Sequence, residues 1–412
     1  MTKKQIYDIG VNRAVDCDLI IVGGGIVGAT FACALKDSGL RVIIIEAQTP
    51  EKAAARQRAY NLSLLSGRIF EGIGVWGQIL PQIAQYRNIR LSDGEYPSAV
   101  EFVPADLGTE VLGYVAGHGV ILSALQRFLK TCPGIQWLCP AEVIDICWED
   151  TEVTVEVQVE GKMRQLRSPL IVGADGAKSQ VRSRSRISTR GWKYWQSCLT
   201  FEIQHQHPHN DTAFERFWNT GPMGVLPLPG NRCQIVLTAP HATAKALKDL
   251  DEVSFQQELE RRMGGVLGKV EAIGDRFIFP VQLMQSENYT RSRLALIGDA
   301  AHCCHPVGGQ GLNLGLRDAA ALAQVLQEAH KLGEDIGSLP VLRRYEKWRK
   351  GENLTILGFT DFLDRMFSNQ WLPLILLRRL GLWMLRYIQP LKVFALQLMT
   401  GLKGRTPELA KN

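Results

Sequence analysis

The sequence lacks any Cys-x-x-Cys pair, although its 412 residues include nine cysteines. An odd and scattered set of cysteines does not form the paired framework of a disulfide-rich secreted protein. The composition fits a reducing compartment, and we expect the protein in the cytoplasm.

Long apolar runs are also absent. No window holds the ~20 consecutive apolar residues that a membrane-spanning helix requires. The strongest run starts at Trp371 and is ended by Arg378 and Arg379. The N-terminal segment is polar and mixed in charge, without the apolar stretch of a secretory signal. We therefore expect neither a spanning helix nor export.

Acidic residues are missing from one region. Between Gln370 and Arg405 there are six Lys or Arg residues, no Asp or Glu, and many Leu, Trp, Phe and Met residues. Two interpretations remain open for this region. It is an amphipathic segment that docks peripherally on anionic lipid or on a partner in a biosynthetic complex, or it is a C-terminal helix packed on the main α/β domain. The net charge of +6 is modest, and we expect no nucleic-acid partner.

What the sequence does contain is the composition of an ordinary folded protein. Hydrophobic residues make up 46% and charged residues 21%, which is ordinary for globular proteins. Asp18 to Val22 and Arg41 to Ile45 are short, mostly β-branched apolar runs, which predicts buried strands. Ile26 to Ser38 predicts a helix between them, with Gly39 as its C-terminal cap. Together these segments predict a βαβ unit.

A glycine-rich turn joins the first predicted strand to the helix. Gly23 allows a tight turn, Gly25 lets the backbone approach a pyrophosphate, and Gly28 allows close packing of helix on strand. The phosphates would lie at the helix N-terminus, where free N–H groups and the helix dipole favour anions. Glu46 follows the second strand, where a carboxylate suits ribose hydroxyls and repels a 2′-phosphate. The pattern favours FAD or NAD over NADP, and the alternative is a glycine-rich turn in an unrelated α/β protein.

Two further turns follow short predicted strands. Asp175 lies in one of them, where it either contacts the cofactor or simply ends a strand in an Asp-Gly turn. Asp299 lies in the other and can accept a hydrogen bond from a ribityl hydroxyl. Pro306 would fix the backbone beside the ring system of a bound flavin. We therefore expect Pro306 to shape the side of the flavin on which the reaction takes place. A long predicted helix follows, and its first backbone N–H groups are expected to face the flavin, which is anionic when reduced. The residues concerned are Gly309, Gly311, Leu312 and Asn313.

Two groups of side chains resemble metal sites at first sight. His302-Cys303-Cys304-His305 places four donors in a row, but adjacent residues do not easily all point at one ion, and structural zinc uses separated ligand pairs. His205, His207 and His209 alternate as they would on one face of a strand, but Pro208 interrupts that strand. We predict no metal ion at either place.

The stretch from His305 to Asp318, HPVGGQGLNLGLRD, resembles the signature of the ubiquinone-biosynthesis FAD-dependent monooxygenases of UbiH type, which are similar to p-hydroxybenzoate hydroxylase. The resemblance implies an α/β fold with a GR2-type Rossmann-like FAD domain, an inserted β-sheet substrate domain and a helical C-terminus. It also places Arg58 near the isoalloxazine ring, as a cofactor-binding and catalytic residue. The segment Gly117-His118-Gly119 departs from the Glu-Asn-Arg that is more usual in the family. Shorter segments agree with the family, namely Gly74-Val75-Trp76, Leu112-Gly113-Tyr114-Val115, Ala213-Phe214-Glu215-Arg216-Phe217 and Gly221-Pro222.

The dinucleotide-binding signals near residues 20, 175 and 300 predict that one domain is assembled from separated stretches. We expect residues 1–185 to form the first part of the FAD domain, with some substrate-domain segments near 77–110. Residues 186–280 would form the β-rich substrate domain and residues 281–345 the second part of the FAD domain. Residues 346–412 would form a helical C-terminal region in contact with a membrane or a partner.

The resemblance implies an FAD-dependent hydroxylase that acts on the ring of a polyprenyl phenol or benzoquinol in quinone biosynthesis. The reaction would use O2 together with NAD(P)H, bound transiently, or with an external electron donor. Two alternatives are a non-catalytic flavoprotein subunit of a biosynthetic complex and an enzyme of flavin-reductase type. The sequence assigns no catalytic base and leaves the oligomeric state open.

Overall fold

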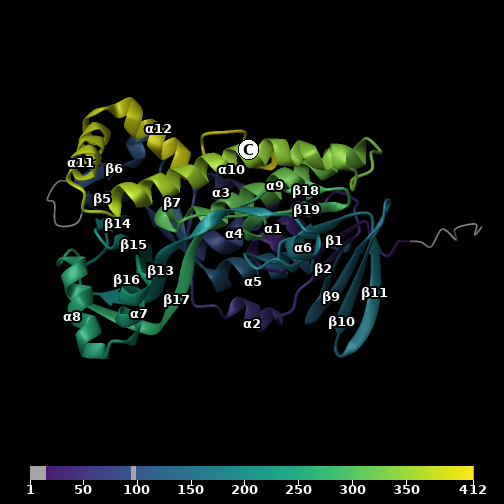
Figure 1. The fold of residues 1–412 in the computed structure, drawn as a ribbon, viewed down its shortest axis with the longest axis horizontal. Coiled ribbons are helices and arrows are strands. Elements are labelled where there is room, and N and C mark those ends of the chain that lie inside the picture. The colour runs from purple at the N-terminus through teal and green to yellow at the C-terminus, as the bar shows by residue number, and fades with distance from the viewer. Residues whose placement is uncertain (1–14, 94–98, 412) are drawn as a thin grey trace, which may run out of the picture.

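The computed structural model describes residues 15–93 and 99–411, which form two sheet-based parts and a helical C-terminal region (Figure 1). The polar N-terminal segment and the centre of the 77–110 region, for which expectations were stated, lie outside the described residues. The division of the chain at residues 185, 280 and 345 stays a prediction.

A mostly parallel sheet forms the centre of the first part. It has six strands, in the order β18 (Thr290–Arg291), β19 (Leu294–Leu296), β12 (Ile171–Gly173), β1 (Leu19–Val22), β2 (Val42–Ile45) and β8 (Ile135–Leu138). All neighbours run parallel except β18 and β19. The four inner strands, β19, β12, β1 and β2, carry no polar side chain and are fully buried, which is typical of parallel sheets that are covered on their faces.

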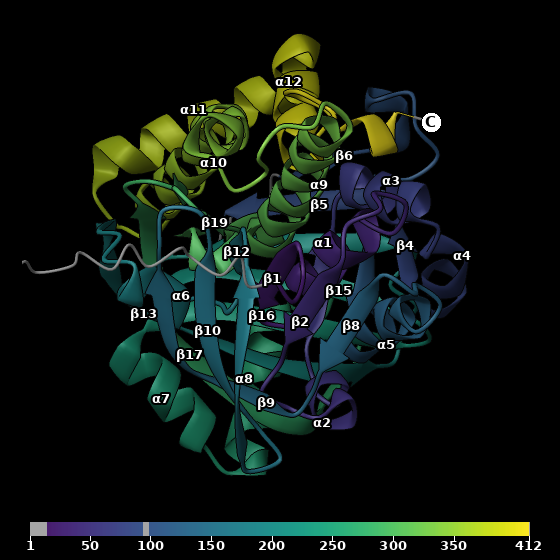
Figure 2. The ribbon, with the colours of Figure 1, turned by 90° about the vertical axis from the view of Figure 1, so that its right-hand side faces the viewer.

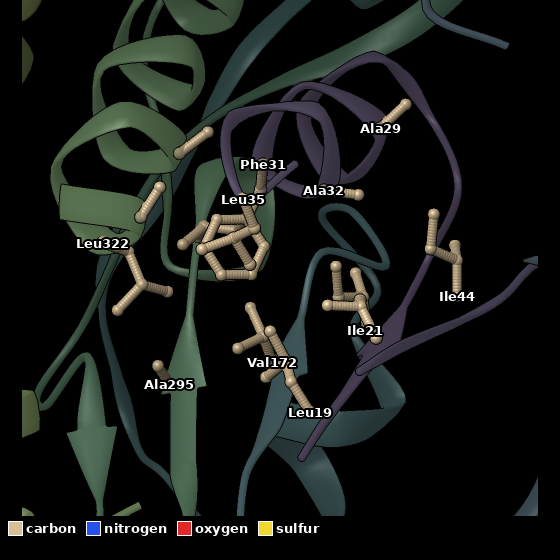
Figure 3. Close-up of a cluster of buried hydrophobic side chains, with 14 of the residues drawn as sticks. Leu19, Ile21, Ala29, Phe31, Ala32, Leu35, Ile44, Val172, Ala295 and Leu322 are labelled. Carbon is tan, nitrogen blue, oxygen red and sulfur yellow. The ribbon is translucent and has the colours of Figure 1, made fainter. Parts of the chain in front are cut away.

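Helices α1 (Ile26–Ala34) and α9 (Gln310–Lys331) lie side by side on this sheet. Figure 3 shows Phe31 of α1 and Leu322 of α9 among the side chains of β1, β12 and β19, and all of these side chains are buried. Helix α5 (His118–Leu129) packs against α1. The sheet therefore holds the N-termini of α1 and α9 at its carboxyl edge, where ligands bind in folds of this type.

The prediction of a helix from Ile26 to Ser38 was four residues too long. The helix ends at Ala34, after which the backbone N–H groups of Leu35 and Ser38 donate to carbonyls three residues earlier. Such bonds form tight turns rather than a continued α-helix. The Ser38 hydroxyl also donates to the Leu35 carbonyl oxygen (2.6 Å), which competes with helical pairing. Gly39, with φ of +78°, belongs to the connection into β2 and is not the helix cap.

The second part is an eight-stranded sheet. Its order is β20 (His302–Cys303), β17 (Val270–Ser286), β13 (Thr189–His205), β16 (Arg232–Pro240), β15 (Gly221–Leu228), β14 (Thr212–Trp218), β5 (Asn88–Asp93) and β6 (Ala99–Phe102). Helices α7 (His241–Asp249) and α8 (Glu252–Met263) pack their apolar side chains on β13, β15 and β16. Strands from three separated regions of the chain therefore build one surface.

Two small antiparallel sheets and several short helices complete the framework. The first sheet has the order β11 (Lys162–Ser168), β10 (Val153–Val159) and β9 (Ala141–Trp148). The second has the order β3 (Ala59–Leu62), β7 (Gly113–Gly117) and β4 (Ala84–Tyr86). The short helices are α2 (Pro50–Ala54), α3 (Leu64–Ile73), α4 (Trp76–Ile79) and α6 (Gln180–Arg184).

Three helices form the C-terminal region. Helix α10 (Leu339–Phe367) runs along α9, and α11 (Leu372–Tyr387) and α12 (Gln389–Thr400) lie over β5 and β6, far from β9–β11 (Figures 1 and 2). Leu382 of α11 and Leu396 of α12 are buried with Phe102 and Phe367. The inner faces of α11 and α12 thus pack on the eight-stranded sheet. Helix α10, which runs along α9, precedes the region from Gln370 to Arg405. In the described part of the chain, no helix has the length and apolar composition needed to cross a bilayer.

Candidate cofactor and substrate site

One cavity of about 880 Å³ joins the carboxyl edge of the six-stranded sheet to the face of the eight-stranded sheet. Its walls include the turn after β1, the turn after β12 and the loop before α9 at one end. At the other end they include side chains of β14, β15 and β17 and the inner faces of α10, α11 and α12. The tertiary structure therefore brings the three predicted turns together and connects them to an apolar chamber.

The turn after β1 shows what each predicted glycine does. Gly23 has φ of +104°, and a Cβ there would lie 2.4 Å from the Ala174 carbonyl oxygen. A Cβ on Gly28 would lie 2.0 Å from the Gly23 carbonyl oxygen, so α1 can approach the turn only with glycine at this position. A Cβ on Gly25 would meet no atom within 4 Å. The protein itself therefore requires Gly23 and Gly28, whereas the space above Gly25 is open at the N-terminus of α1.

Two carboxylates line the cavity near this turn. Glu46 accepts hydrogen bonds from the backbone N–H groups of Gly24 (2.8 Å) and Gln48 (2.8 Å), which fixes its side chain at the end of β2. Asp175 accepts from Gln180 N (2.7 Å) with one oxygen, and its other oxygen, Oδ1, is buried without a partner. An orphaned acceptor of this kind is costly unless a ligand or water completes it.

The loop before α9 supplies the rest of this end of the cavity. The Asp299 side chain is open to the cavity, but the surrounding protein removes it from bulk water, and this desolvation raises the pKa of its carboxyl. Pro306 lies beside Gly308 and Gly309, whose φ angles of +69° and +63° are readily adopted by glycine. The lining residues at the start of α9 are Gly309, Gln310, Gly311 and Leu312.

Asn313 and Gly28 do not line the cavity. The Asn313 side chain is fully buried, donates to the Asn61 carbonyl oxygen (2.9 Å) and accepts from Ser63 N (2.8 Å). It thereby ties the start of α9 to β3 and to the N-terminus of α3. The Asn313 side chain therefore supports the loop, and the expected contact of the Asn313 backbone N–H with the cofactor stays a prediction.

Arg58 and His118 lie on another wall of the cavity. The guanidinium of Arg58 lies over the rings of Tyr60 (5.1 Å) and Phe279 (4.9 Å). His118 is buried, and its ring nitrogens contact Tyr60 Oη (3.1 Å) and the Ala53 carbonyl oxygen (2.9 Å). Burial, together with the positive charge of Arg56, lowers the pKa of His118 to about 4. A neutral histidine therefore stands where the family signature has Asn.

A buried ionic network beneath the Asp299 turn was missed at the level of sequence. Asp318 accepts hydrogen bonds from His302 Nε2 (2.5 Å), Arg349 Nε (2.9 Å), Asn353 Nδ2 (3.0 Å) and the backbone N–H of Gly298 (3.1 Å). Burial alone would raise the pKa of Asp318, but these partners outweigh it and lower the pKa to about 2. The sequence offered one indication of its importance, because Asp318 is the last residue of the stretch that resembles the family signature.

The two histidine groups are occupied by protein contacts. His302 bonds to Asp318, while His305 Nε2 lies 3.2 Å from Gln196 Oε1 and 3.4 Å from Asp364 Oδ1. Strand β13 ends at His205, so His207 and His209 lie beyond it. His205 Nδ1 contacts the His207 carbonyl oxygen (2.8 Å), and its ring packs edge-on against that of His209. Among the residues that the structure describes, no cluster of three or more His, Cys, Asp or Glu side chains is arranged to hold a metal ion.

Glu215 is a second residue that sequence reasoning missed, although it stands in one of the segments that agree with the family. It lies on β14 and points into the apolar end of the cavity, beside Gly224 and the Gly308 backbone. Desolvation raises the pKa of its carboxyl to about 7, against a smaller lowering by the Gly308 N–H. Its neighbours along the chamber are Phe214, Phe217, Leu226, Leu363, Leu385 and Met399.

Residues 16–350 match the FAD-binding domain family (FAD_binding_3). The chain belongs to this family. It is 37% identical to ubiquinone hydroxylase UbiL of Rhodospirillum rubrum, covering 91% of this chain and 87% of that one. It is 34% identical to 3-demethoxyubiquinol 3-hydroxylase of Escherichia coli, over 93% and 98% of the two chains. An uncharacterized protein of Synechocystis is 55% identical over 95% of both chains.

Solved structures share the fold. The p-nitrophenol 4-monooxygenase of Pseudomonas putida superimposes with a TM-score of 0.79 at 19% identity, covering 94% of this chain and 98% of that one. An anhydrotetracycline hydroxylase of Streptomyces rimosus gives a TM-score of 0.74 at 20% identity, over 95% and 77% of the chains. The predicted fold class and the resemblance to UbiH-type monooxygenases are confirmed.

As a member of the FAD-binding domain family, the chain offers a site that fits the cofactor. The open space at Gly25 leaves a backbone cradle at the N-terminus of α1, and the unpartnered Oδ1 of Asp175 leaves an acceptor free. Carboxylates at Glu46 and Asp299 stand at two other places along the same cavity wall. An elongated ligand with a diphosphate and several hydroxyls matches these donors and acceptors.

Proposed function

We propose that this FAD-dependent enzyme hydroxylates the ring of a prenylated phenol or quinol, with O2 and with NAD(P)H as a transient reductant. The single observation that carries the proposal is the continuous cavity, which leads from the three dinucleotide-type turns to an apolar chamber. Relatives named ubiquinone hydroxylase and 3-demethoxyubiquinol 3-hydroxylase support a quinol with an apolar tail.

The proposed division of labour along the cavity follows its chemistry. Gly25 and the N-terminus of α1 would take the diphosphate, and Glu46 the hydroxyls of the adenosine ribose. Asp299 would accept from the ribityl chain, while Gly309, Gly311 and Leu312 would face the isoalloxazine ring. When bound, FAD supplies the electron transfer and oxygen activation that amino-acid side chains do not.

The chain itself would orient the substrate ring and exclude water. Phe217 and Phe367 stack with centroids 3.8 Å apart at the chamber wall, and leucines of α11 and α12 complete it. Such a wall accommodates an apolar tail through burial of its CH₂ groups, worth about 0.8 kcal/mol each. Pro306 and Gly308 would hold the loop backbone at the face where the ring meets the cofactor.

The nicotinamide would bind without a nucleotide fold of its own. The sequence contains two Gly-x-Gly-x-x-Gly patterns, at residues 23–28 and 72–77. The second lies between helices α3 and α4, so the first is the one that joins a strand to a helix, and the proposed cofactor occupies it. Arg58 and Lys178 line the cavity and are the proposed contacts for a negatively charged reductant. A separate reductase that delivers electrons is the alternative that the test below distinguishes.

The visible absorption spectrum of the purified protein tests this function. Bound oxidised flavin should give bands near ~370 and ~450 nm that are bleached by NADPH or NADH under anaerobic conditions. Reoxidation in air with 2-geranylphenol or a geranyl benzoquinol should then yield a product heavier by one oxygen atom, detected by mass spectrometry. Bands that no nicotinamide bleaches would favour an external donor, and the absence of any product from these probes would contradict the hydroxylase proposal.

We also propose that the outer faces of α11 and α12 contact a lipid surface. Large apolar side chains are exposed there, including Trp371 (65%), Trp383 (55%) and Tyr387 (61%). Trp and Tyr are the residues enriched at the membrane–water boundary. The inner faces of the same helices line the chamber, so an apolar tail would pass from lipid to the site along one wall. The other exposed apolar residues are Leu372, Leu376, Leu377, Leu380, Ile388 and Phe394.

Replacing Leu380 and Trp383 with glutamate is expected to lower the fraction bound to anionic vesicles at least about tenfold, because two exposed apolar contacts become charged. Co-sedimentation with phosphatidylglycerol vesicles measures this fraction. The matched control is Trp195→Glu, which alters an exposed tryptophan (87%) on β13, outside α11 and α12. Equal binding of the two variants, or no binding by the wild type, would rule out this docking face.

A further inference from the structure

The apolar chamber contains one carboxyl that the proposed roles above do not use. Glu215 lies on β14 between Phe214 and Arg216, and its Oε2 faces Gly224 of the neighbouring strand β15. A Cβ built on Gly224 would lie only 3.6 Å from this oxygen, so the missing side chain leaves room beside the carboxyl. The backbone N–H of Gly308, in the loop before α9, also interacts with the Glu215 carboxyl.

We propose that Glu215 accepts the proton of the substrate's ring hydroxyl, an inference that rests on the proposed hydroxylase function. The carboxyl stands where the apolar chamber meets the loop Pro306–Gly309, which is where a ring would lie between the tail pocket and the cofactor. A general base must lie within hydrogen-bond reach of the proton that it removes. Glu215 can meet this condition, because its carboxyl lines the cavity beside this loop.

The proton balance of this step is complete within the site. The O–H bond of the ring hydroxyl breaks, the proton forms a new O–H bond on a Glu215 carboxyl oxygen, and the electron pair stays on the ring oxygen. The ring becomes more electron-rich at the carbon ortho to that oxygen, which favours attack on an electrophilic oxygen donor. Glu215 releases the proton to water when the product leaves, and the Gly308 N–H stabilises the carboxylate again.

The protonation state of Glu215 suits this role. Burial raises the pKa of its carboxyl to about 7, and the backbone N–H of Gly308 lowers this pKa by a smaller amount. Tyr86 and Cys304 also line the cavity, and Cys198 is close enough to interact with Glu215. Burial raises the pKa of all three groups, to about 12 for both thiols. Asp299 and Arg58 lie at the cofactor side of the same cavity. Between about pH 6 and pH 8, Glu215 is therefore the group of this chamber that changes its charge.

A coloured phenol tests the contact without any turnover. 4-Nitrophenol absorbs at longer wavelength when ionised, so its pKa in complex with the protein can be read by spectrophotometric titration. A carboxylate beside the bound hydroxyl disfavours the phenolate, so the wild type should raise this pKa by about one unit or more relative to Glu215→Gln. Tyr86→Phe removes another polar group from the same chamber, keeps the carboxyl and should retain the shift.

Turnover provides the second readout. Glu215→Gln should lower the hydroxylation rate on the order of 100-fold, the usual contribution of a general base, and should abolish the rise of the rate near pH 7. Flavin reduction by the nicotinamide should persist, with oxygen then reduced to hydrogen peroxide. Glu215→Asp should restore part of the rate, which a residue needed only for folding would not predict.

The outcomes separate this inference from the proposed function. Identical 4-nitrophenol titrations for the wild type and Glu215→Gln, or full hydroxylation by Glu215→Gln, overturn the role of Glu215 while the hydroxylase function stands. A shift that depends on Glu215 in a protein that hydroxylates no phenol supports the contact and contradicts the function. Failure of 4-nitrophenol to bind the wild type overturns the chamber as a phenol site.

Discussion

Replacing Gly25 with valine is expected to abolish FAD binding while the protein remains folded. A Cβ at this position meets no protein atom within 4 Å, so the substitution fills only the space proposed for the diphosphate. Blocking two charge-assisted hydrogen bonds, each worth about 1.5–3 kcal/mol, corresponds to a loss of affinity of at least about 100-fold. The ratio of flavin to protein absorbance and a fluorescence titration with FAD measure it.

Gly28→Ala is the matched control for this prediction. Its Cβ would lie 2.0 Å from the Gly23 carbonyl oxygen, so α1 must move away from the turn and the thermal unfolding midpoint should fall together with FAD binding. Gly25→Val should leave the midpoint of the apo-protein nearly unchanged. Retention of stoichiometric FAD by Gly25→Val would show that the diphosphate lies elsewhere.

Replacing Asp318 with asparagine is expected to cost about 3–5 kcal/mol of unfolding free energy, because a buried ion pair loses one partner. Asp318 and Arg349 are both almost fully inaccessible, so Arg349 would be left charged without its main counterion. Denaturant unfolding followed by circular dichroism measures the loss. Glu334→Gln removes one partner of an exposed ion pair with Arg344 and should change the midpoint far less.

The same carboxylate predicts a pH dependence. The pKa of Asp318 is lowered to about 2 in the folded protein, whereas an unfolded aspartate has a value of about 3.9. The stabilisation is therefore fully present above about pH 4 and is lost as the pH falls toward about 2. This component of acid sensitivity should be missing from Asp318→Asn. An unchanged acid profile in that variant would mean that other carboxylates dominate acid unfolding.

The residues of the site that lie directly after the strands of the βαβ unit were predictable from sequence. Gly23, Gly25 and Glu46 lie in one βαβ unit, where a few consecutive residues determine a strand, a turn and the start of a helix. Their places on the cavity agree with this expectation, and their contacts with a cofactor stay predictions. The end of α1 was misplaced because competing turns after Ala34 depend on local hydrogen bonds that periodicity does not report.

Sequence patterns could not predict the surroundings of three other side chains, namely Glu215, Asp318 and Asn313. The pattern that contains Glu215 predicts a strand, but one of the two neighbours of that strand, β5, comes from a distant region of the chain. Whether a carboxyl faces solvent or an apolar chamber depends on those neighbours. Asn313 belongs to a motif associated with the cofactor, yet its buried bonds to β3 and α3 give it a supporting place.

The sequence by itself determined the local dinucleotide turns, the fold class and the family, because these depend on short stretches with characteristic spacing. The tertiary structure decided which faces meet. It placed the turns at residues 23, 175 and 299 around one cavity and set Glu215 at its apolar end. It also turned one face of α11 and α12 inward and left the other exposed. The physical reason is that burial and desolvation depend on packing between segments distant in the chain, which no local pattern contains.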